Sequence, residues 1–218
     1  MPKITNIEFR RRKPERFIVY FDDDQVHTFS PETALKYRFS LDKDFGDEEF
    51  VEILEEDSIR RAKDQALRYL TLRSHSKKEV ILKLMKKGYR ENIINSALQH
   101  LENVGLIDDN KFAIQYIENE HILRPCGKNL MRKKLYQKGF RAENVEPLLK
   151  EFYRKYDERS IALETAKKFN RTHKYLSDNN KKKEKLTRHL LSRGFNWDIM
   201  NYVFDKIQTI GKSEDDLL

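Results

Sequence analysis

The first thirty residues alternate apolar and polar side chains, a pattern that predicts β-strands. Ile7 and Phe9 alternate in "NIEFRR", and Phe17, Val19 and Phe21 alternate in "RFIVYF". The turn-forming segments "KPER" and "DDDQ" separate these runs from each other and from "QVHTF". The sequence therefore predicts a three-stranded antiparallel meander with Phe17, Val19 and Phe21 on an apolar face.

Two helices are expected to complete an N-terminal head over residues 1–57. In "SPETALKY", Ser30 is a suitable N-cap and Pro31 takes the first helical position. "DEEFVEILEED" predicts a second, acidic helix. The aspartates at 22–24 are interpreted as a solvated hairpin tip rather than a metal site, because no partner ligand accompanies them.

From about Ser58 onward the apolar period becomes helical, and one phrase recurs three times. It reads "KEVILKLMKKGY", "NLMRKKLYQKGF" and "EKLTRHLLSRGF", with an aromatic residue after Gly88, Gly139 and Gly194. Counted from each glycine, positions −8, −4, +1, +6, +9, +10 and +13 are apolar in all three copies. The last four make one helical stripe. Position −4 holds Leu84, Leu135 and Leu190.

Each copy predicts three helices, the second of which ends at the glycine. Glycine readily adopts the left-handed conformation that stops a helix, and the aromatic residue then turns back into the core. We expect first helices over 58–72, 110–122 and 158–172, and a capping box over residues 76–79. Pro147 indicates either a late start of its helix or a kink.

The predicted fold is therefore mainly α, with tandem three-helix repeats that follow the small β-meander and its helices. The expected boundaries are 1–57 for the head, 58–107, 108–157 and 158–210 for the repeats, and 211–218 for a tail. Only 7 glycines and 5 prolines among 218 residues argue against a turn-rich all-β protein.

Charge divides the chain at the same place. The head carries 9 Lys and Arg against 15 Asp and Glu, whereas the remainder carries 35 against 21. A basic body suits a polyanion or an acidic protein surface as its partner. The alternative is a solvated helical surface that is merely rich in lysine.

The remaining chemistry favours a cytoplasmic binding protein over an enzyme. Cys126 is the single cysteine, which excludes an intrachain disulfide and fits a reducing compartment. No apolar run reaches the roughly 18 residues of a membrane span, and the N-terminus lacks a signal peptide's apolar stretch. No phosphate-binding glycine loop, metal-spaced His/Cys cluster or serine elbow occurs, so we expect no metal and no cofactor.

Basic residues also recur at matched positions around each second helix. Positions −5 and −1 share one flank of that helix, position −15 precedes it, and position +2 follows the glycine. We predict that these residues form the interaction surface; the alternative is that they only solvate helix ends. They are Arg73, Lys83, Lys87 and Arg90 in copy one, Arg124, Lys134, Lys138 and Arg141 in copy two, and Arg193 in copy three.

A helix-turn-helix DNA reader is the rival interpretation of three helices with a glycine turn. The third helix of that motif meets the bases, but its outer face here is neutral to acidic, with Glu91, Glu143 and Glu146. Such a face repels phosphate, so sequence-specific groove reading is disfavoured.

Several segments resemble the RecX family, regulators of the RecA recombinase. They are "RAKDQALRYLTLRSHSKKEVILKLMKKGY", "VGLIDDNKFAIQYIENEHILRPCGKNLMRKKLYQKGF" and "KLTRHLLSRGFNWDIM", within about residues 58–208. The third copy departs most, because Asn179 replaces the arginine at −15 and "THKYLSDNNKKKEK" lengthens the link between its first two helices.

The resemblance implies tandem three-helix repeats that lie in the groove of RecA filaments on DNA. It implies inhibition of ATP hydrolysis, strand exchange and coprotease activity, through blocked filament growth and promoted disassembly. The expected partners are the RecA filament and single- or double-stranded DNA, and the protein is expected to be a monomer. The alternative is a repeat-type nucleic-acid-binding protein that acts independently of RecA.

Overall fold

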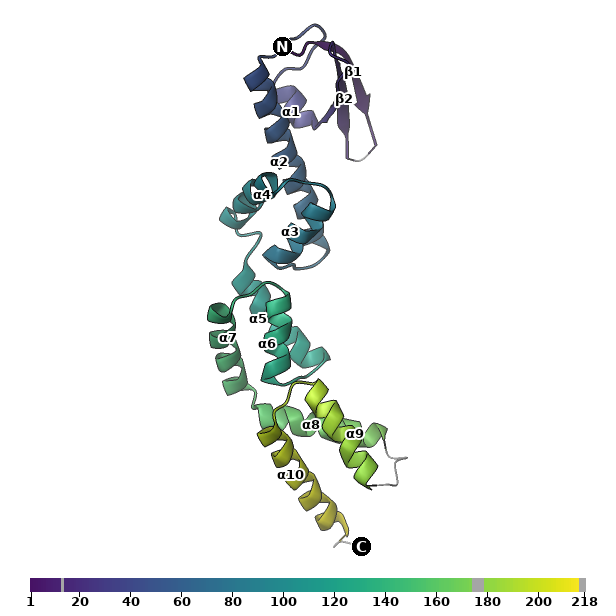
Figure 1. Cartoon of the computed structure of the whole chain (residues 1–218), viewed down its shortest axis with the longest axis vertical. Helices are drawn as coiled ribbons and strands as arrows, with labels where there is room; N and C mark the ends of the chain where they lie inside the picture. Colours follow the sequence, from purple (N-terminus) through teal and green to yellow (C-terminus); the bar gives the residue numbers. More distant parts are fainter. Residues whose placement is uncertain (13, 174–178, 216–218) are drawn as a thin grey trace. The chain divides into compact units, whose positions relative to one another are not determined.

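The computed structural model describes residues 1–12, 14–173 and 179–215. The chain forms two compact units, which divide between Asp108 and Asp109. The first unit contains the β-rich head and the first three-helix repeat, and the second contains the other two repeats (Figure 1). The predicted fold class, mainly α with a small N-terminal sheet, is confirmed.

The head contains the predicted antiparallel meander. Strands β1 (Ile4–Arg10), β2 (Arg16–Phe21) and β3 (Val26–Phe29) lie in the order β1-β2-β3. Val19 and Phe21 are buried in the core of the head, and Phe17 packs against it. Asp24 at the hairpin tip has a φ of 59°, a conformation that Asp tolerates better than most residues.

Helix α1 (Pro31–Lys36) begins as predicted, because the Ser30 side chain accepts a hydrogen bond from the Thr33 amide. Helix α2 (Asp47–Leu72) corrects the sequence prediction. The acidic helix and the first helix of copy one, expected as two, are one continuous helix of 26 residues. No glycine or proline interrupts residues 47–72, so nothing in the local sequence stops the helix there.

The helices of the repeats follow the predicted order. Copy one uses the end of α2 with α3 (Lys77–Lys86) and α4 (Glu91–Asn103). Copy two consists of α5 (Asp109–Leu123), α6 (Lys128–Gln137) and α7 (Ala142–Lys155). Copy three consists of α8 (Glu158–Thr172), α9 (Asn179–Ser192) and α10 (Trp197–Asp215).

The predicted local features are also present, with two refinements. Ser76 and Glu79 form the capping box at the start of α3. Pro147 lies inside α7 rather than at a late start. Helix α10 continues into the predicted tail as far as Asp215. Residues 174–178 of the lengthened link in copy three lie outside the described residues.

The recurrent phrase codes for one helix-ending turn, repeated three times. Gly88, Gly139 and Gly194 have φ values of 87°, 101° and 81°. In copy one the Gly88 amide donates to the Met85 carbonyl, at 2.9 Å, and the Tyr89 amide donates to the Leu84 carbonyl, at 3.3 Å. The other two copies repeat both bonds. This pair of bonds is a Schellman motif, which satisfies the last carbonyls of the helix and turns the aromatic residue back toward it.

The turn places the repeated apolar positions in the cores of the repeats. Leu84, Leu135 and Leu190 are each fully buried, at 0% exposure. The aromatic residues of copies two and three, Phe140 and Phe195, are buried as well. Each repeat therefore has its own hydrophobic core, built around the leucine four residues before the glycine.

Repeats two and three approach each other closely through their backbones at two glycines. The Gly127 amide donates to the Arg193 carbonyl at 2.8 Å. A Cβ atom added to Gly127 would lie 2.6 Å from the Gly194 carbonyl oxygen, and one added to Gly194 would lie 2.4 Å from the Leu130 amide nitrogen. Only glycine allows this approach. Gly127 stands at the position that Ser76 occupies in copy one, where the serine provides a cap.

The missing cap of α6 is supplied by the next repeat. A Glu158 carboxylate oxygen at the start of α8 accepts a hydrogen bond from the Lys128 amide, at 2.7 Å. This carboxylate satisfies an amide that α6 itself cannot satisfy, and its charge suits a helix N-terminus. Three features thus help to join repeats two and three. They are the close approach of Gly127 and Gly194, the hydrogen bond from the Gly127 amide to the Arg193 carbonyl, and the Glu158 carboxylate that caps α6.

The buried leucines give the first prediction. Leu84→Ala, Leu135→Ala and Leu190→Ala should each lower the free energy of unfolding by about 2–5 kcal/mol, because each leaves a cavity. Leu82→Ala, in α3 at 55% exposure, is the matched control and should cost much less. Urea unfolding curves measure the difference; equal midpoints for Leu84→Ala and Leu82→Ala would contradict the assigned cores.

The glycine contact gives the second prediction. Gly88→Ala should cost about 1–2 kcal/mol, because its φ is left-handed while nothing lies within 4 Å of the added Cβ. Gly194→Ala should cost clearly more, because the same strain is joined by a backbone collision. Gly88 and Gly194 hold the same position in copies one and three, and thermal unfolding of the two variants compares their losses of stability. Equal losses of stability would show that the contact between repeats two and three tolerates a methyl group.

Candidate basic interface

Five of the nine predicted binding residues have partners within their own repeat. The lysines at −5 bind the first helix: Lys83 lies 4.6 Å from the centre of the Tyr69 ring, and Lys134 pairs with Glu120. Lys134 and Glu120 are only 20% and 19% exposed. The recurrence at −5 therefore reflects a contact inside each of these repeats.

Of the other three partnered residues, two are more exposed: the side chains of Arg73 and Arg141 are 54% and 83% exposed. Arg73 pairs with Glu79 at 3.3 Å, and Arg141 lies 4.0 Å from Glu143. Lys138 lies 5.4 Å from the centre of the Tyr116 ring. The exposed ion pairs of Arg73 and Arg141 contribute about 0–1 kcal/mol each, so a strong partner anion can displace them.

The remaining four predicted residues form no ion pair with any described carboxylate. Lys87 and Arg90 flank the glycine turn of copy one, while Arg124 and Arg193 come from copies two and three. Lys87 and Arg90 stay together as members of one repeat, whereas Arg124 and Arg193 meet although they belong to different repeats. The structure places one pair in each of two basic pockets, one per unit.

The first pocket, here called the head pocket, lies between the head and repeat one. Its volume is about 710 Å³. Lys87 and Arg90 line it from the glycine turn, Arg61 and Glu55 line it from α2, and His27 lines it from β3. Burial lowers the pKa of His27. The head therefore contributes to a basic surface that the sequence assigned to the repeat alone.

A buried carboxylate holds the head against α2 at this pocket. Asp57 is 1% exposed, and one of its oxygens accepts hydrogen bonds from the Ser30 amide and the Thr33 hydroxyl, each at 2.8 Å. The Arg61 guanidinium lies 2.8 Å from the other oxygen. The network links α1 to α2 and explains why Arg61 is the least free of the pocket's cations. An Asp and an Arg four residues apart are the weak local pattern that could have indicated it.

The second pocket, here called the junction pocket, lies where repeats two and three meet. Its volume is about 510 Å³. Arg124 enters from the end of α5, Lys168 and Arg171 from α8, and Arg193 from the end of α9. None of these four side chains pairs with a carboxylate among the described residues. Sequence comparison of the repeats missed Lys168 and Arg171, because they lie just before the lengthened link of copy three.

Aromatic rings form one wall of the junction pocket. Phe169 is 8% exposed and stacks on His173 with ring centres 3.9 Å apart; its ring lies 5.0 Å from that of His189. Burial lowers the pKa of His189, and the nearby Arg193 and His173 lower it further.

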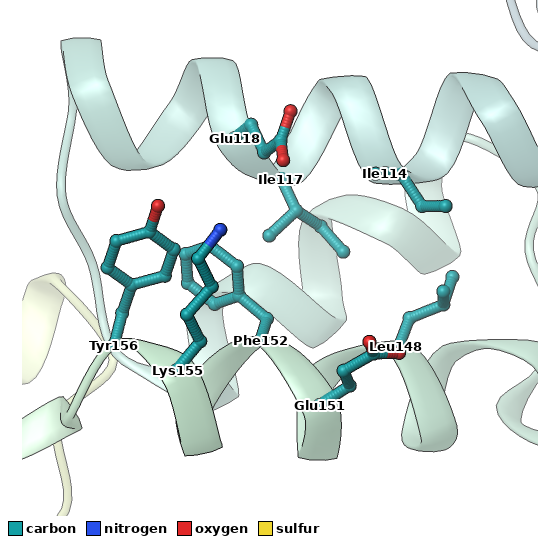
Figure 2. A pocket seen from close by; sticks show the side chains of 8 residues that line it. All are labelled: Ile114, Ile117, Glu118, Leu148, Glu151, Phe152, Lys155 and Tyr156. Carbon is teal, nitrogen blue, oxygen red and sulfur yellow. The ribbon is translucent and has the colours of Figure 1, made fainter.

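A third, smaller pocket of about 150 Å³ lies between α5 and α7. Figure 2 shows Ile114 and Ile117 of α5 facing Leu148 and Phe152 of α7. Glu118, Glu151 and Lys155 are among its other lining residues, so it differs in chemistry from the two basic pockets.

The acids of the third helices are not all free. Glu91 and Glu143 are exposed, as expected, but Glu146 of α7 bonds to Arg132 at 2.5 and 3.1 Å. This pairing lowers the pKa of Glu146. Charge reversal at Glu146 would therefore disturb the packing of α6 on α7 as well as the surface charge.

Known proteins share both the sequence and the repeat architecture. The profile described as "RecX, first three-helix domain" matches residues 62–101, and "RecX, third three-helix domain" matches residues 157–204. The regulatory protein RecX of Clostridium perfringens (strain SM101 / Type A) is 34% identical over 210 residues, covering 95% of this chain and 97% of that protein. The chain belongs to the RecX family of regulatory proteins.

Further RecX proteins agree with this assignment. The regulatory protein RecX of Leuconostoc mesenteroides is 29% identical over 217 residues, covering 100% of this chain and 80% of that protein. Two crystal structures share the fold. A regulatory protein RecX gives a TM-score of 0.67 at 21% identity, covering 94% of this chain and 100% of its own. RecX from Lactobacillus salivarius gives a TM-score of 0.61 at 23% sequence identity, covering 71% of this chain and 99% of its own.

The names of these relatives describe RecX as a regulatory protein. Within the described ranges, no three His, Cys, Asp or Glu residues are grouped to hold a metal ion. The same part of the chain contains no helix long and apolar enough to cross a membrane.

The junction gives the third prediction. Burial raises the pKa of Glu158, although the Lys128 amide opposes the shift. A raised carboxyl pKa means that ionisation costs stability at neutral pH, and that this cost disappears as the pH falls through the folded-state pKa. Glu158→Gln should therefore gain stability relative to the native protein at neutral pH, and the gain should shrink in acid.

The neighbouring Asp157 provides a control of opposite sign. The Ser160 side chain and backbone bond to Asp157 and lower its pKa. Asp157→Asn should therefore lose stability relative to the native protein at neutral pH, and that loss should shrink as the pH falls through the folded-state pKa. Urea unfolding between about pH 2.5 and 8 compares the variants, because the lowered pKa of Asp157 places its transition at the acid end of this range. Parallel pH profiles of the two variants would contradict the electrostatic assignment.

Proposed function

We propose that this protein regulates RecA by binding RecA filaments on DNA. It lies in the helical groove of the filament and inhibits ATP hydrolysis, strand exchange and coprotease activity. It acts by blocking filament extension and by promoting disassembly, without an enzymatic activity of its own. Membership of the RecX family carries the proposal, and the proposed setting is the cytoplasm, where the protein acts as a monomer in recombination and DNA repair.

The tandem repeats support a filamentous partner. A filament presents the same surface at regular intervals, and repeats in series can contact successive copies of it. Contacts that are weak alone become effective together, because the first contact raises the effective concentration of the next. This arrangement needs no deep catalytic cleft, in agreement with shallow basic pockets on short helical units.

Charge supports a partner with acidic groups or phosphates. Lys87 and Arg90 project from a helix-ending turn and have no carboxylate partner among the described residues. Forming new ion pairs with them breaks no existing ones. The partnered lysines Lys83 and Lys134, in contrast, would first have to leave contacts inside their repeats. We therefore assign the main filament contacts of unit one to Lys87 and Arg90.

A second candidate function is nucleic-acid binding without RecA. The junction pocket favours it, because it gathers four cations that no described carboxylate neutralises. The two functions differ in one requirement: a filament regulator needs RecA for its effect, whereas a free nucleic-acid binder does not.

The fourth prediction tests the filament contact. Lys87→Glu combined with Arg90→Glu should leave helix content intact but weaken inhibition of RecA at least tenfold, because two attractive contacts become repulsive. The measurement is ATP hydrolysis by RecA on single-stranded DNA, with the protein added before or after filament assembly.

The matched control reverses two exposed cations of the same unit, Arg68 and Lys78, which lie outside the head pocket. It should inhibit RecA nearly as well as the native protein. If both double variants lost the same degree of RecA inhibition, the effect would be explained by net charge alone rather than by the position of Lys87 and Arg90. Native protein that leaves RecA hydrolysis unchanged in either order of addition would overturn the proposed function.

A further inference from the structure

An apolar groove with acidic rims lies between helices of repeat two, in a chain whose net charge is +8. The pocket between α5 and α7 adjoins a second pocket of about 470 Å³, because Lys155 and Tyr156 line both. The second pocket extends to α8, where Asp157 and Glu164 line it. The two pockets together are here called the acidic groove. Four Asp and Glu residues line it against a single Lys or Arg, which is Lys155.

The floor of the groove is apolar and partly open to solvent. Ile117 is 2% exposed, whereas Ile114, one turn earlier in α5, is 47% exposed. Figure 2 shows both side chains facing Leu148 and Phe152 of α7. An apolar cavity of about 150 Å³ can hold a group as large as benzene. This part of the groove therefore has room for one large apolar side chain.

Two of the four acids have no positive partner among the described residues. Glu164 pairs with Lys167 at 2.9 Å, and Asp157 is the N-cap of α8. Glu118 of α5 and Glu151 of α7 are exposed, and neither forms an ion pair with a described cation. They line the same pocket from the two helices on its opposite sides (Figure 2). Each is thus free to pair with a cation brought by a partner.

The remaining polar groups do not neutralise these acids. The Lys155 ammonium lies 5.1 Å from the centre of the Tyr156 ring. The His121 ring packs against aromatic rings, with its centre 4.5 Å from that of Tyr156 and 5.3 Å from that of Phe152. Burial lowers the pKa of His121, so the imidazole is neutral at neutral pH. The groove therefore remains negative beside an aromatic wall.

The free acids belong to repeat two and not to the repeat pattern. Glu118 and Glu151 stand at positions −21 and +12 from the glycine of their copy. Copy one has Leu67 and His100 at these positions, and copy three has Lys206 at +12. Packing that is common to the repeats therefore does not account for the two carboxylates.

This chemistry favours a basic protein segment over nucleic acid. Carboxylates repel phosphates, so the acidic groove is the opposite of a phosphate site. An apolar floor gains from burial of an apolar side chain, and carboxylates at its edges bind Lys or Arg by charge-assisted hydrogen bonds. A protein segment can bring both kinds of side chain within a few residues.

We propose that the acidic groove binds a segment of a partner protein that carries one large apolar side chain with Lys or Arg on either side of it. The apolar side chain enters the pocket between α5 and α7 over Ile114, and the basic side chains pair with Glu118 and Glu151. These two acids lie outside both basic pockets. The groove therefore adds a second kind of contact to the proposed function, and its test needs no RecA.

The fifth prediction uses fluorescence anisotropy of a labelled peptide of about ten residues, mixed with the full chain. The peptide has one central leucine, two lysines on each side of it, and glycine and serine elsewhere. It should bind at least about fivefold more tightly than the same peptide with serine in place of leucine, because the leucine is buried on binding. A peptide with glutamate in place of every lysine should not bind.

Charge reversal gives the decisive comparison. Glu118→Lys combined with Glu151→Lys should weaken binding of the lysine–leucine peptide at least about tenfold, because two attractive contacts become repulsive. The same variant is more basic than the native protein, so a polyanion would bind it more tightly. Ile114→Asn should weaken binding of the leucine peptide but leave that of the serine peptide unchanged.

The matched control is Glu143→Lys combined with Glu184→Lys. These side chains are 70% and 64% exposed, lie in the same unit and do not line the groove. The control makes the same change in charge and should alter peptide affinity less than about threefold. Circular dichroism and thermal unfolding check the fold of every variant.

The proposal is wrong if the native chain does not bind the lysine–leucine peptide, or if the groove and control variants lose affinity equally. It is also wrong if the native chain associates with itself in sedimentation velocity and the groove variant does not, since the occupant would then be a second copy of this chain. Peptide binding by a protein that does not inhibit RecA would support the groove and overturn the proposed function. Inhibition of RecA without peptide binding would do the reverse.

Discussion

The fold depends on one backbone constraint, the left-handed glycine that ends the second helix of every repeat. The Schellman bonds of this turn bring the aromatic residue back over the leucine four positions before the glycine, which is buried in each core. The same turn leaves the residues beside it in solvent. In copy one, Leu84 lies in the core while Lys87 and Arg90 point outward. The buried core position and the exposed cations are therefore set by the same local geometry.

Matched positions can share a structural cause without sharing a function. At −5, Lys83 lies over an aromatic ring and Lys134 pairs with a carboxylate, each within its own repeat. Their recurrence follows from the packing of the second helix on the first. Position −1 is less constrained, and there Lys87 is exposed without an ion pair while Lys138 lies over Tyr116. The absence of an internal counter-charge therefore distinguishes candidate binding residues better than recurrence does.

Sequence was sufficient for features that depend on neighbouring residues. The Ser30 cap, the capping box at Ser76 and the glycine turns arise from interactions within a few positions, and the meander joins strands that are neighbours along the chain. All of these features were predicted. The long helix α2 was missed because the repeat boundary suggested a break that no residue imposes. Asp57, Glu158 and the close approach of Gly127 join elements about 20 to 70 residues apart, so no local pattern reveals them.

The two basic pockets arise where the repeat symmetry is interrupted. Cations that pair with groups of their own repeat are less available to a binding partner. A junction brings together cations from different segments, and the packing inside a single repeat does not supply counter-charges for them. In unit one the interruption is the head, held to α2 by Asp57. In unit two it is the contact between Gly127 and Gly194, which brings Arg124 beside Arg193. A partner that engages both pockets gains from their covalent connection, because each occupied pocket raises the effective concentration of the other. Loss of either pocket should then weaken binding by more than its isolated affinity suggests, so the contribution of each has to be measured in the full chain.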